Sequence, residues 1–343
     1  MNRKAAAGAC SFNVNKLYYL GNPEDGFGWG VANTNLIRSL GEFCEVEIAP
    51  RTRRTFNAPI FVPIATQDLK PDVKYDAPLV MGYCFLEWPI PDKARVHARA
   101  YDLLFAGSTW NVQRLAEKGI KAQPLLQGID HERFSIKPWN ESKPFVVFSG
   151  GKFEYRKGQD LVIAAMRLFM KMHPDSVLIA AWHNKWPQSI ATMQHSNMIN
   201  LEDPFAGLPE GRVVHVPPMP NEKTPEVYAQ AHIGLFPNRC EAGTNLVMCE
   251  FMACGRPVIA TYAHGHKDVL DRNEYILPNG SYDPAGWFHC NISDIIAKLE
   301  HAYKHREELK DRGQASASLV SNLTWRACAE KICEAAFPAP VPV

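Results

Sequence analysis

The feature that most constrains this chain is a repeated alternation of short apolar segments with longer segments of helical periodicity. In the first half, the strand-like segments lie at residues 17–21, 46–49, 78–85 and 102–107. Helix-like segments follow at ANTNLIRSL (32–40) and NVQRLAEKGI (111–120). Because strands that alternate with helices usually pair in parallel, the pattern predicts an α/β fold built on a mostly parallel sheet.

The second half repeats the same order of elements after a polar, proline-containing stretch at 128–144. The expected strands and helices there are FVVFSG from Phe145, QDLVIAAMRLFMKMH, SVLIAAW, VVHV, IGLFP and RPVIA, followed by two terminal helices, at 295–313 and 324–337. A chain of 343 residues also exceeds the size at which one hydrophobic core stops growing. We therefore expect two domains, at 1–140 and 141–320.

Composition excludes several classes of protein. The chain has 37 Lys and Arg against 36 Asp and Glu, so its overall charge gives no reason to expect a nucleic-acid partner. The nine cysteines lack the spacing of a zinc module, and reduced cytoplasmic thiols are the simplest interpretation. No apolar run approaches the roughly 20 residues of a transmembrane helix. Arg51, Arg53 and Arg54 could contact an anionic membrane surface, but three exposed cations contribute modestly and a solvated loop is the favoured interpretation.

The chemistry concentrates in the segment 235–260, LFPNRCEAGTNLVMCEFMACGRPVIA. It predicts a strand, a loop, a helix and a second strand. Gly243 permits a close turn, and Thr244 or Asn245 can cap the helix that follows. The free backbone N–H groups near Thr244, Asn245 and Leu246 would then form a site for a phosphate group.

Two carboxylates border this helix start. Glu241 precedes the helix, and Glu250 lies on it about two turns later. Carboxylates accept hydrogen bonds from vicinal hydroxyl groups, so acids that flank an anion site suit a nucleotide sugar. A capped helix with a solvated glutamate is the alternative interpretation of the segment alone.

The segment resembles the paired-glutamate signature of retaining GT-B glycosyltransferases of family 4, E-G-F-G-L-V-x-x-E-A-M-A-x-G-x-P-V. The matching residues are Gly243, Leu246, Val247, Glu250, Met252, Ala253, Gly255, Pro257 and Val258. The resemblance implies that the first glutamate contacts the transferred sugar and the second the ribose of the donor. This chain departs from the pattern, because its carboxylates are nine positions apart instead of eight and Ala242 stands at the usual place of the first glutamate.

A second match lies at SGGKFEYRKGQDLVIAA, which resembles the family pattern G-R-L-x-x-x-K-G-x-D-x-L-I-x-A. Lys152 stands at the arginine position and Lys157 at the lysine position. The family uses this basic pair to neutralise the diphosphate that leaves, which implies catalytic roles for Lys152, Lys157 and Glu241. Arg156 is a possible substitute if the loop register is shifted.

Weaker signals come from other loops. GFGWG at 26–30 resembles the first glycine-rich loop of the family, so Gly28 and Gly30 are expected near the donor. Glu87, Trp29 and His266 are candidates for contact with the acceptor or sugar. Trp182 and Trp186 could reach the base or pack in the core. His264 and His266 lack a recognisable third metal ligand, so no metal site is expected.

The resemblance implies two facing Rossmann-like domains, with the terminal helix at 321–343 crossing back to the first. The implied function is metal-independent, retaining transfer of a hexose from a UDP- or GDP-sugar to a carbohydrate, glycan or glycolipid. A phosphorylase-like or epimerase-like enzyme and a non-catalytic nucleotide-sugar-binding subunit remain alternatives. A dinucleotide-dependent dehydrogenase is disfavoured, since the glycine fingerprint with its acidic partner is missing.

Overall fold

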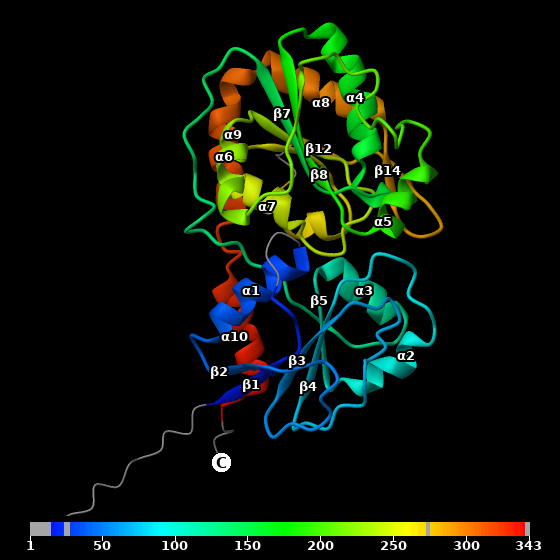
Figure 1. The fold of residues 1–343 in the computed structure, drawn as a ribbon, viewed down its shortest axis with the longest axis vertical. Coiled ribbons are helices and arrows are strands. Elements are labelled where there is room, and N and C mark those ends of the chain that lie inside the picture. Colours follow the sequence, from blue (N-terminus) through cyan, green and yellow to red (C-terminus); the bar gives the residue numbers. More distant parts are fainter. Residues whose placement is uncertain (1–14, 24–27, 272–274, 340–343) are drawn as a thin grey trace, which may run out of the picture.

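The computed structural model describes residues 15–23, 28–271 and 275–339, and its two sheets lie one above the other in Figure 1. The lower sheet has the strand order β2-β1-β3-β4-β5-β6. Its strands are β1 (Lys16–Tyr19), β2 (Glu45–Ile48), β3 (Ile60–Ile64), β4 (Val80–Cys84), β5 (Leu103–Ala106) and β6 (Gln123–Pro124), all paired in parallel. The helices of this domain are α1 (Gly28–Leu40), α2 (Ala94–His97) and α3 (Thr109–Glu117), with a 3₁₀ turn η1 (Ala98–Ala100) after α2.

Strand β3 is absent from the strands expected above, because its sequence IFVPI contains a proline. Ile60 donates its backbone N–H to Leu79 O on the β4 side, and alternation along a strand directs the nitrogen of Pro63 toward the β1 side. Pairing with β1 ends at Phe61. Pro63 therefore removes no ladder hydrogen bond, and the proline is tolerated inside the sheet.

The upper sheet has the order β12-β11-β10-β7-β8-β9, and its strands also pair in parallel. The strands are β7 (Phe145–Lys152), β8 (Ser176–His183), β9 (Val213–His215), β10 (Ile233–Phe236), β11 (Val258–Thr261) and β12 (Tyr275–Leu277). An antiparallel hairpin of β13 (Gly280–Tyr282) and β14 (Phe288–Cys290) follows.

The remaining helices surround this upper sheet or continue beyond it. They are α4 (Gln159–Met172), α5 (Pro187–Ala191), α6 (Thr224–Ala229), α7 (Leu246–Ala253), α8 (Ile292–Lys304), α9 (Leu309–Leu319) and α10 (Trp325–Ala336). The 3₁₀ turns are η2 (Tyr155–Lys157), η3 (Thr192–His195), η4 (Asn221–Lys223), η5 (His264–Asp268) and η6 (Arg306–Glu308). The single helix expected at 295–313 was wrong, because the chain breaks at His305 into α8 and α9.

Both sheets are doubly wound, so each has a point where the strand order reverses. In the upper sheet this point lies between β7 and β10, and in the lower sheet between β1 and β3. Ligands of such sheets bind outside the carboxyl ends of the strands at the reversal. The loop after β7 holds Lys157 and the loop after β10 holds Glu241, so the topology brings these distant residues to one place.

The terminal helix α10 packs against α1 of the first domain, where Figure 1 shows the two helices side by side. Trp325, Cys328 and Ile332 of α10 are buried with Leu17 and Leu36 of the first domain. This apolar contact ties the end of the chain to the lower sheet. The exact domain boundaries given above remain predictions.

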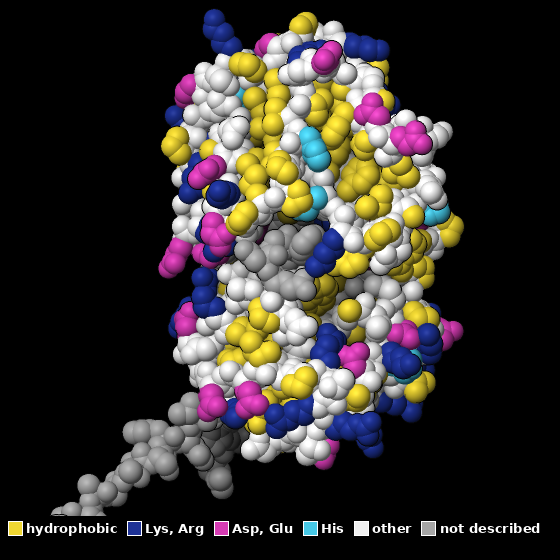
Figure 2. All heavy atoms as spheres, in the orientation of Figure 1, with side chains coloured by type: hydrophobic (Ala, Val, Ile, Leu, Met, Phe, Trp, Pro, Cys, Tyr) yellow, Lys and Arg dark blue, Asp and Glu magenta, His cyan; other side chains and the backbone are white. Residues whose placement is uncertain are grey.

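The described surface carries mixed charge. Figure 2 shows cationic and acidic side chains interspersed over the first domain on the face drawn. Arg51 pairs with Asp72 at 2.5 Å and Arg53 with Glu47 at 3.0 Å, so two of the three arginines considered for membrane contact are neutralised. Within the parts of the chain that the structure describes, no helix has both the length and the apolar character needed to cross a bilayer.

Candidate active site

Helix α7 begins where the sequence predicts an anion site. Asn245 caps it: the side chain accepts a hydrogen bond from Met248 N, and the backbone has a left-handed φ of 64°. Asparagine tolerates this conformation better than most residues. Gly243 is required by close approach, because a Cβ there would lie 2.7 Å from the ring of Phe85 in the first domain. The loop before α7 is thus pressed against the opposite domain.

A charged cluster lies beside this loop. Lys157 Nζ is 2.5 Å from Glu241 Oε2, and Asn238 Nδ2 donates to the same oxygen at 2.9 Å. Arg156 Nη1 approaches that oxygen at 3.5 Å. Although Glu241 stands one position earlier than the first glutamate of the family pattern, its carboxylate still contacts Lys157.

The same arginine extends the cluster in two further directions. Arg156 Nη2 is 2.7 Å from Glu154 Oε1, and its Nε is 2.9 Å from Glu87 Oε2 of the first domain. Glu154 in turn pairs with Lys152, whose Nζ lies 3.1 Å from Oε2. Three cations and three carboxylates form one chain of contacts that crosses the domain interface.

The surroundings shift the pKa values of Glu241 and Glu87 in opposite directions. Burial alone would raise the pKa of Glu241, but the positive charges of Lys157 and Arg156 lower it to about 2. Burial raises the pKa of Glu87 to about 7, although Arg156 opposes the shift. Glu241 is consequently a stable anion at neutral pH, whereas Glu87 titrates near neutrality.

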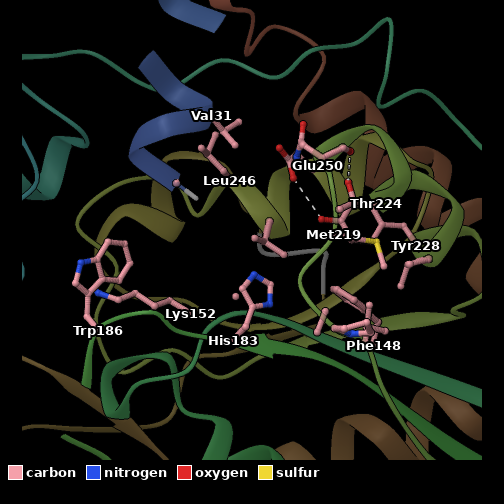
Figure 3. Close-up of a pocket in the computed structure, with 18 residues that line it drawn as sticks. Val31, Phe148, Lys152, His183, Trp186, Met219, Thr224, Tyr228, Leu246 and Glu250 are labelled. Atoms are coloured by element: carbon pink, nitrogen blue, oxygen red, sulfur yellow. Dashed lines mark hydrogen bonds between the residues drawn. The ribbon is translucent and has the colours of Figure 1, made fainter. Parts of the chain in front are cut away.

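A pocket opens next to the cluster and is bordered by both domains. Figure 3 shows Lys152 and Trp186 at one end, Glu250 and Tyr228 at the other, and Val31 of α1 beside Leu246 of α7. The further described residues that line it are Gly28, Phe148, Gly151, Ala181, His183, Val216, Pro217, Met219, Asn221, Thr224, Val227 and Val247. The predominantly apolar lining with a few polar groups at its ends has the character of a small-molecule site.

Glu250 supplies the acidic end of this pocket. Tyr228 donates its hydroxyl to Glu250 Oε2 at 3.3 Å, and burial raises the pKa of the Glu250 carboxyl to about 8. Glu241 is not among the described residues that line the pocket, so the two acids serve neighbouring spaces instead of one shared space.

The lysines predicted as a pair are also divided between these spaces. Lys152 ends strand β7 and lies in the pocket, with its Nζ 4.8 Å from the centre of the Trp186 ring. Lys157 ends η2 and faces Glu241. Glu154 and Arg156 connect them, so a single elongated ligand could contact both.

The first domain contributes the start of α1. Gly28 lines the pocket, and Gly30 is buried in the first turn. Trp29 packs edge-on against Phe85, with ring centres 5.0 Å apart. The predicted glycine-rich loop is already helical from Gly28 onward, and Gly26 and Phe27 lie outside the described residues.

The remaining candidates have structural partners. His266 is buried, its Nδ1 lies 3.0 Å from Thr261 O and its Nε2 lies 3.3 Å from the Asn245 amide. Burial lowers the pKa of His266 to about 4, so the ring is neutral near pH 7. Trp182 is a core residue whose Nε1 donates to Ser149 Oγ at 3.2 Å, while Trp186 borders the pocket. The side-chain roles predicted from the sequence stay predictions.

Three polar residues that support the site are absent from the candidates named from the sequence. They are Asn238 beside Glu241, Tyr228 beside Glu250, and Ser108, whose Oγ donates to Ala242 O across the interface at 2.7 Å. Asn238 lies in the loop that follows a strand and precedes Glu241, which is the one signal that could have identified it.

Most of the second domain resembles a known protein family. Residues 143–290 match the family model described as glycosyl transferases group 1. The sulfoquinovosyl transferase SQD2 of Arabidopsis thaliana is 23% identical over 243 residues, which cover 70% of this chain and 43% of that protein. The putative glycosyltransferase YtcC of Bacillus subtilis is 26% identical over 177 residues, covering 49% of this chain and 42% of that protein. The chain thus matches less than half the length of either relative.

Solved structures share the whole fold at low identity. A sucrose-phosphate synthase from Thermosynechococcus elongatus aligns over 94% of this chain and 98% of its own, with a TM-score of 0.65 and 15% identity. HepE of Anabaena, solved with UDP and glucose, aligns over 95% of this chain and 100% of its own, with a TM-score of 0.68 and 14% identity. The expected α/β architecture of two facing Rossmann-like domains is confirmed. The chain has a GT-B fold, and residues 143–290 of its second domain match the model of the group 1 glycosyl transferases.

Proposed function

We propose that this protein is a glycosyltransferase of the hexosyltransferase type that uses a nucleotide diphosphate sugar as donor. The observation that carries the proposal is the cross-domain site, in which Lys157 and the start of α7 lie next to a pocket that ends at Glu250. The family match of the second domain agrees with this chemistry, and structural neighbours have been solved with UDP and glucose or with UDP-2-fluoro glucose. A UDP- or GDP-sugar is therefore the proposed donor.

In this proposal the nucleoside occupies the apolar pocket. The Glu250 carboxylate accepts hydrogen bonds from the ribose hydroxyls, and Trp186 lies at the other end of the pocket near Lys152. The diphosphate lies between Lys152, Lys157 and the free N–H groups at the start of α7. The sugar then lies near Glu241 and the first domain, where an acceptor can reach it.

The reaction breaks the bond between the anomeric carbon and the phosphate oxygen and forms a bond from that carbon to an acceptor oxygen. Negative charge grows on the departing diphosphate, so Lys157 stabilises the transition state more than the ground state. The proton of the acceptor hydroxyl passes to the leaving phosphate. We propose retention of anomeric configuration, by analogy with the family that the two motifs resemble.

The ligand-free cluster suggests how the donor enters. Lys157 and Arg156 are neutralised by Glu241, Glu154 and Glu87. A diphosphate that approaches Lys157 competes with Glu241 for this cation and leaves the Glu241 carboxylate free to accept hydrogen bonds from a sugar. One exchange of partners would then both bind the donor and orient the sugar.

The acceptor is proposed to be a carbohydrate, a glycan or a glycolipid. Neutralisation of Arg51 and Arg53 removes most of the charge that would have favoured peripheral membrane contact. A cytoplasmic location remains a proposal from the sequence alone.

The test is a thermal-shift screen of nucleoside diphosphates, followed by product analysis with the matching sugar donors. A ligand that binds the native state alone raises the melting temperature, and a transferase releases nucleoside diphosphate in proportion to a new glycoside. Production of a sugar phosphate from free phosphate would identify a phosphorylase instead. Donor binding without either hydrolysis or transfer would identify a non-catalytic subunit.

A further inference from the structure

A buried ion pair joins the two loops of the proposed site. Arg239 follows β10, two residues before Glu241, and Asp160 lies in the first turn of α4, three residues after Lys157. Arg239 Nη1 and Nη2 donate to Asp160 Oδ1 and Oδ2, each at 2.7 Å, and the two side chains are 2% and 0% exposed. Such a two-point contact fixes both distance and orientation.

Arg239 makes further contacts with the loop that carries Lys157. Its Nη1 also donates to Tyr155 O at 2.7 Å, and its guanidinium lies 3.8 Å from the centre of the Tyr155 ring. Its backbone N–H donates to Arg156 O at 2.7 Å. One residue therefore holds the segment 155–157 at several points.

Stability alone is a weak reason for this arrangement. Removing both charges from water costs free energy, and replacing a buried ion pair by well-packed apolar residues is often neutral or stabilising. What an apolar pair cannot supply is the directional fork of a guanidinium on a carboxylate. The pair is thus better suited to fixing the geometry of the loops than to stabilising the domain.

We propose that Arg239 and Asp160 are positioning residues that fix the loops of Lys157 and Glu241 next to each other. In the donor complex the lysine then meets the diphosphate while the carboxylate meets the sugar. Neither residue touches the substrate. Their effect passes through the backbone of 155–157 and 239–241. The inference rests on the proposed function, because it assigns a purpose to the same site.

The first experiment replaces the whole ion pair by apolar residues, Arg239→Met together with Asp160→Leu. We expect the melting temperature to stay near that of the wild type, since no unpaired charge is left buried. We expect kcat for transfer to fall by up to about 100-fold, since a misplacement of about 1 Å in an active site can have an effect of that size. The donor KM should change much less, because Glu250 and the pocket are untouched.

The second experiment keeps the charge but removes the fork. Arg239→Lys should lower kcat of the folded enzyme, since an ammonium cannot bind a carboxylate at two points. Arg256→Lys is the matched control: Arg256 is 1% exposed and donates to Pro138 O and Ala229 O, away from the cluster. The control should lose stability and keep its kcat per folded molecule. If the double variant does not fold, the comparison of Arg239→Lys with Arg256→Lys tests the positioning role instead.

A readout independent of activity is the separation of Lys157 Nζ from Glu241 Oε2 in a crystal structure of the Arg239 variant. The proposal predicts that the 2.5 Å contact is lost. An unchanged contact with wild-type kcat would overturn the positioning role. A wild-type enzyme that transfers no sugar would instead overturn the proposed function, and the crystallographic distance would still judge the positioning role.

Discussion

At the scale of single residues, Lys157 is the cation in closest contact with the proposed sugar-binding carboxylate. We predict that Lys157→Ala lowers kcat about 100-fold or more, because a donor that acts on developing charge is lost. The donor KM should rise less than kcat falls. Steady-state kinetics with the cognate donor measure both. Lys171→Ala, at an exposed position on α4, is the matched control and should behave as the wild type.

Glu250 gives a pH-dependent prediction. Its folded-state pKa of about 8 lies above the usual 4.5, so its stabilising contribution is complete below pH 4.5 and is lost as the pH rises through about 8. The Glu250→Gln variant lacks this loss. We therefore expect the melting temperature of the wild type to fall relative to that of Glu250→Gln between pH 5 and pH 8. Equal slopes for the two proteins would contradict the raised pKa.

The same carboxyl group should link donor binding to pH. Only its ionised form offers all acceptor positions to the ribose hydroxyls. Donor affinity of the wild type should rise as the pH approaches about 8, while Glu250→Gln should bind more weakly and without this trend. Calorimetric titration at several pH values measures the difference.

At the scale of elements, the start of α7 depends on Asn245. Asn245→Ala removes the capping side chain and leaves at φ 64° a residue that lacks asparagine's tolerance of left-handed backbone. We therefore expect a loss of about 1–2 kcal/mol of stability. Asn245→Gly keeps the backbone conformation and should cost only a few tenths of a kcal/mol. Urea unfolding of both variants tests the order. If glycine cost as much as alanine, the left-handed backbone would not be the cause.

Most elements could be predicted from the sequence, because apolar runs next to glycine-rich turns identify buried parallel strands. The short strands β6, β12, β13 and β14 were not expected, because two or three residues show no clear apolar pattern. Two other exceptions have local causes. Pro63 concealed β3, and His305 interrupts a helical pattern that continues on both sides of it.

The candidate site was only partly predictable. Lys157 and Glu241 stand out by motif, but their contact depends on the strand order that places β7 next to β10. Lys152 and Glu250 line a pocket that Lys157 and Glu241 do not line. This division depends on the directions of the side chains, which the motifs do not specify. The link between Arg156 and Glu87 joins residues of different domains, and no short-range pattern encodes it.

Several contacts hold the two domains together. Thr109 donates its N–H to Asp268 Oδ2 at 2.7 Å and its hydroxyl to Oδ1, and Trp287 Nε1 donates to Glu87 O at 2.7 Å. Closure of such a cleft positions the reactants and excludes water. These hydrogen bonds join the two domains in the described structure.

Breaking one of these contacts should loosen closure. We predict that Asp268→Ala gives a larger radius of gyration in small-angle scattering without donor, and that saturating donor reverses the increase. The cost in stability should be about 1 kcal/mol or less, since the contact is partly exposed. Asp311→Ala, on α9 outside the interface, should leave the radius unchanged. Identical scattering of both variants would show that Asp268 does not hold the domains together.

A crystal structure of the wild type soaked with its cognate nucleotide sugar would show directly where the donor binds. We predict that the pyrophosphate lies within hydrogen-bond reach of Lys157 and the first N–H groups of α7, with the ribose at Glu250. A pyrophosphate bound far from the carboxyl ends of β7 and β10, out of reach of Lys157 and the start of α7, would contradict this prediction.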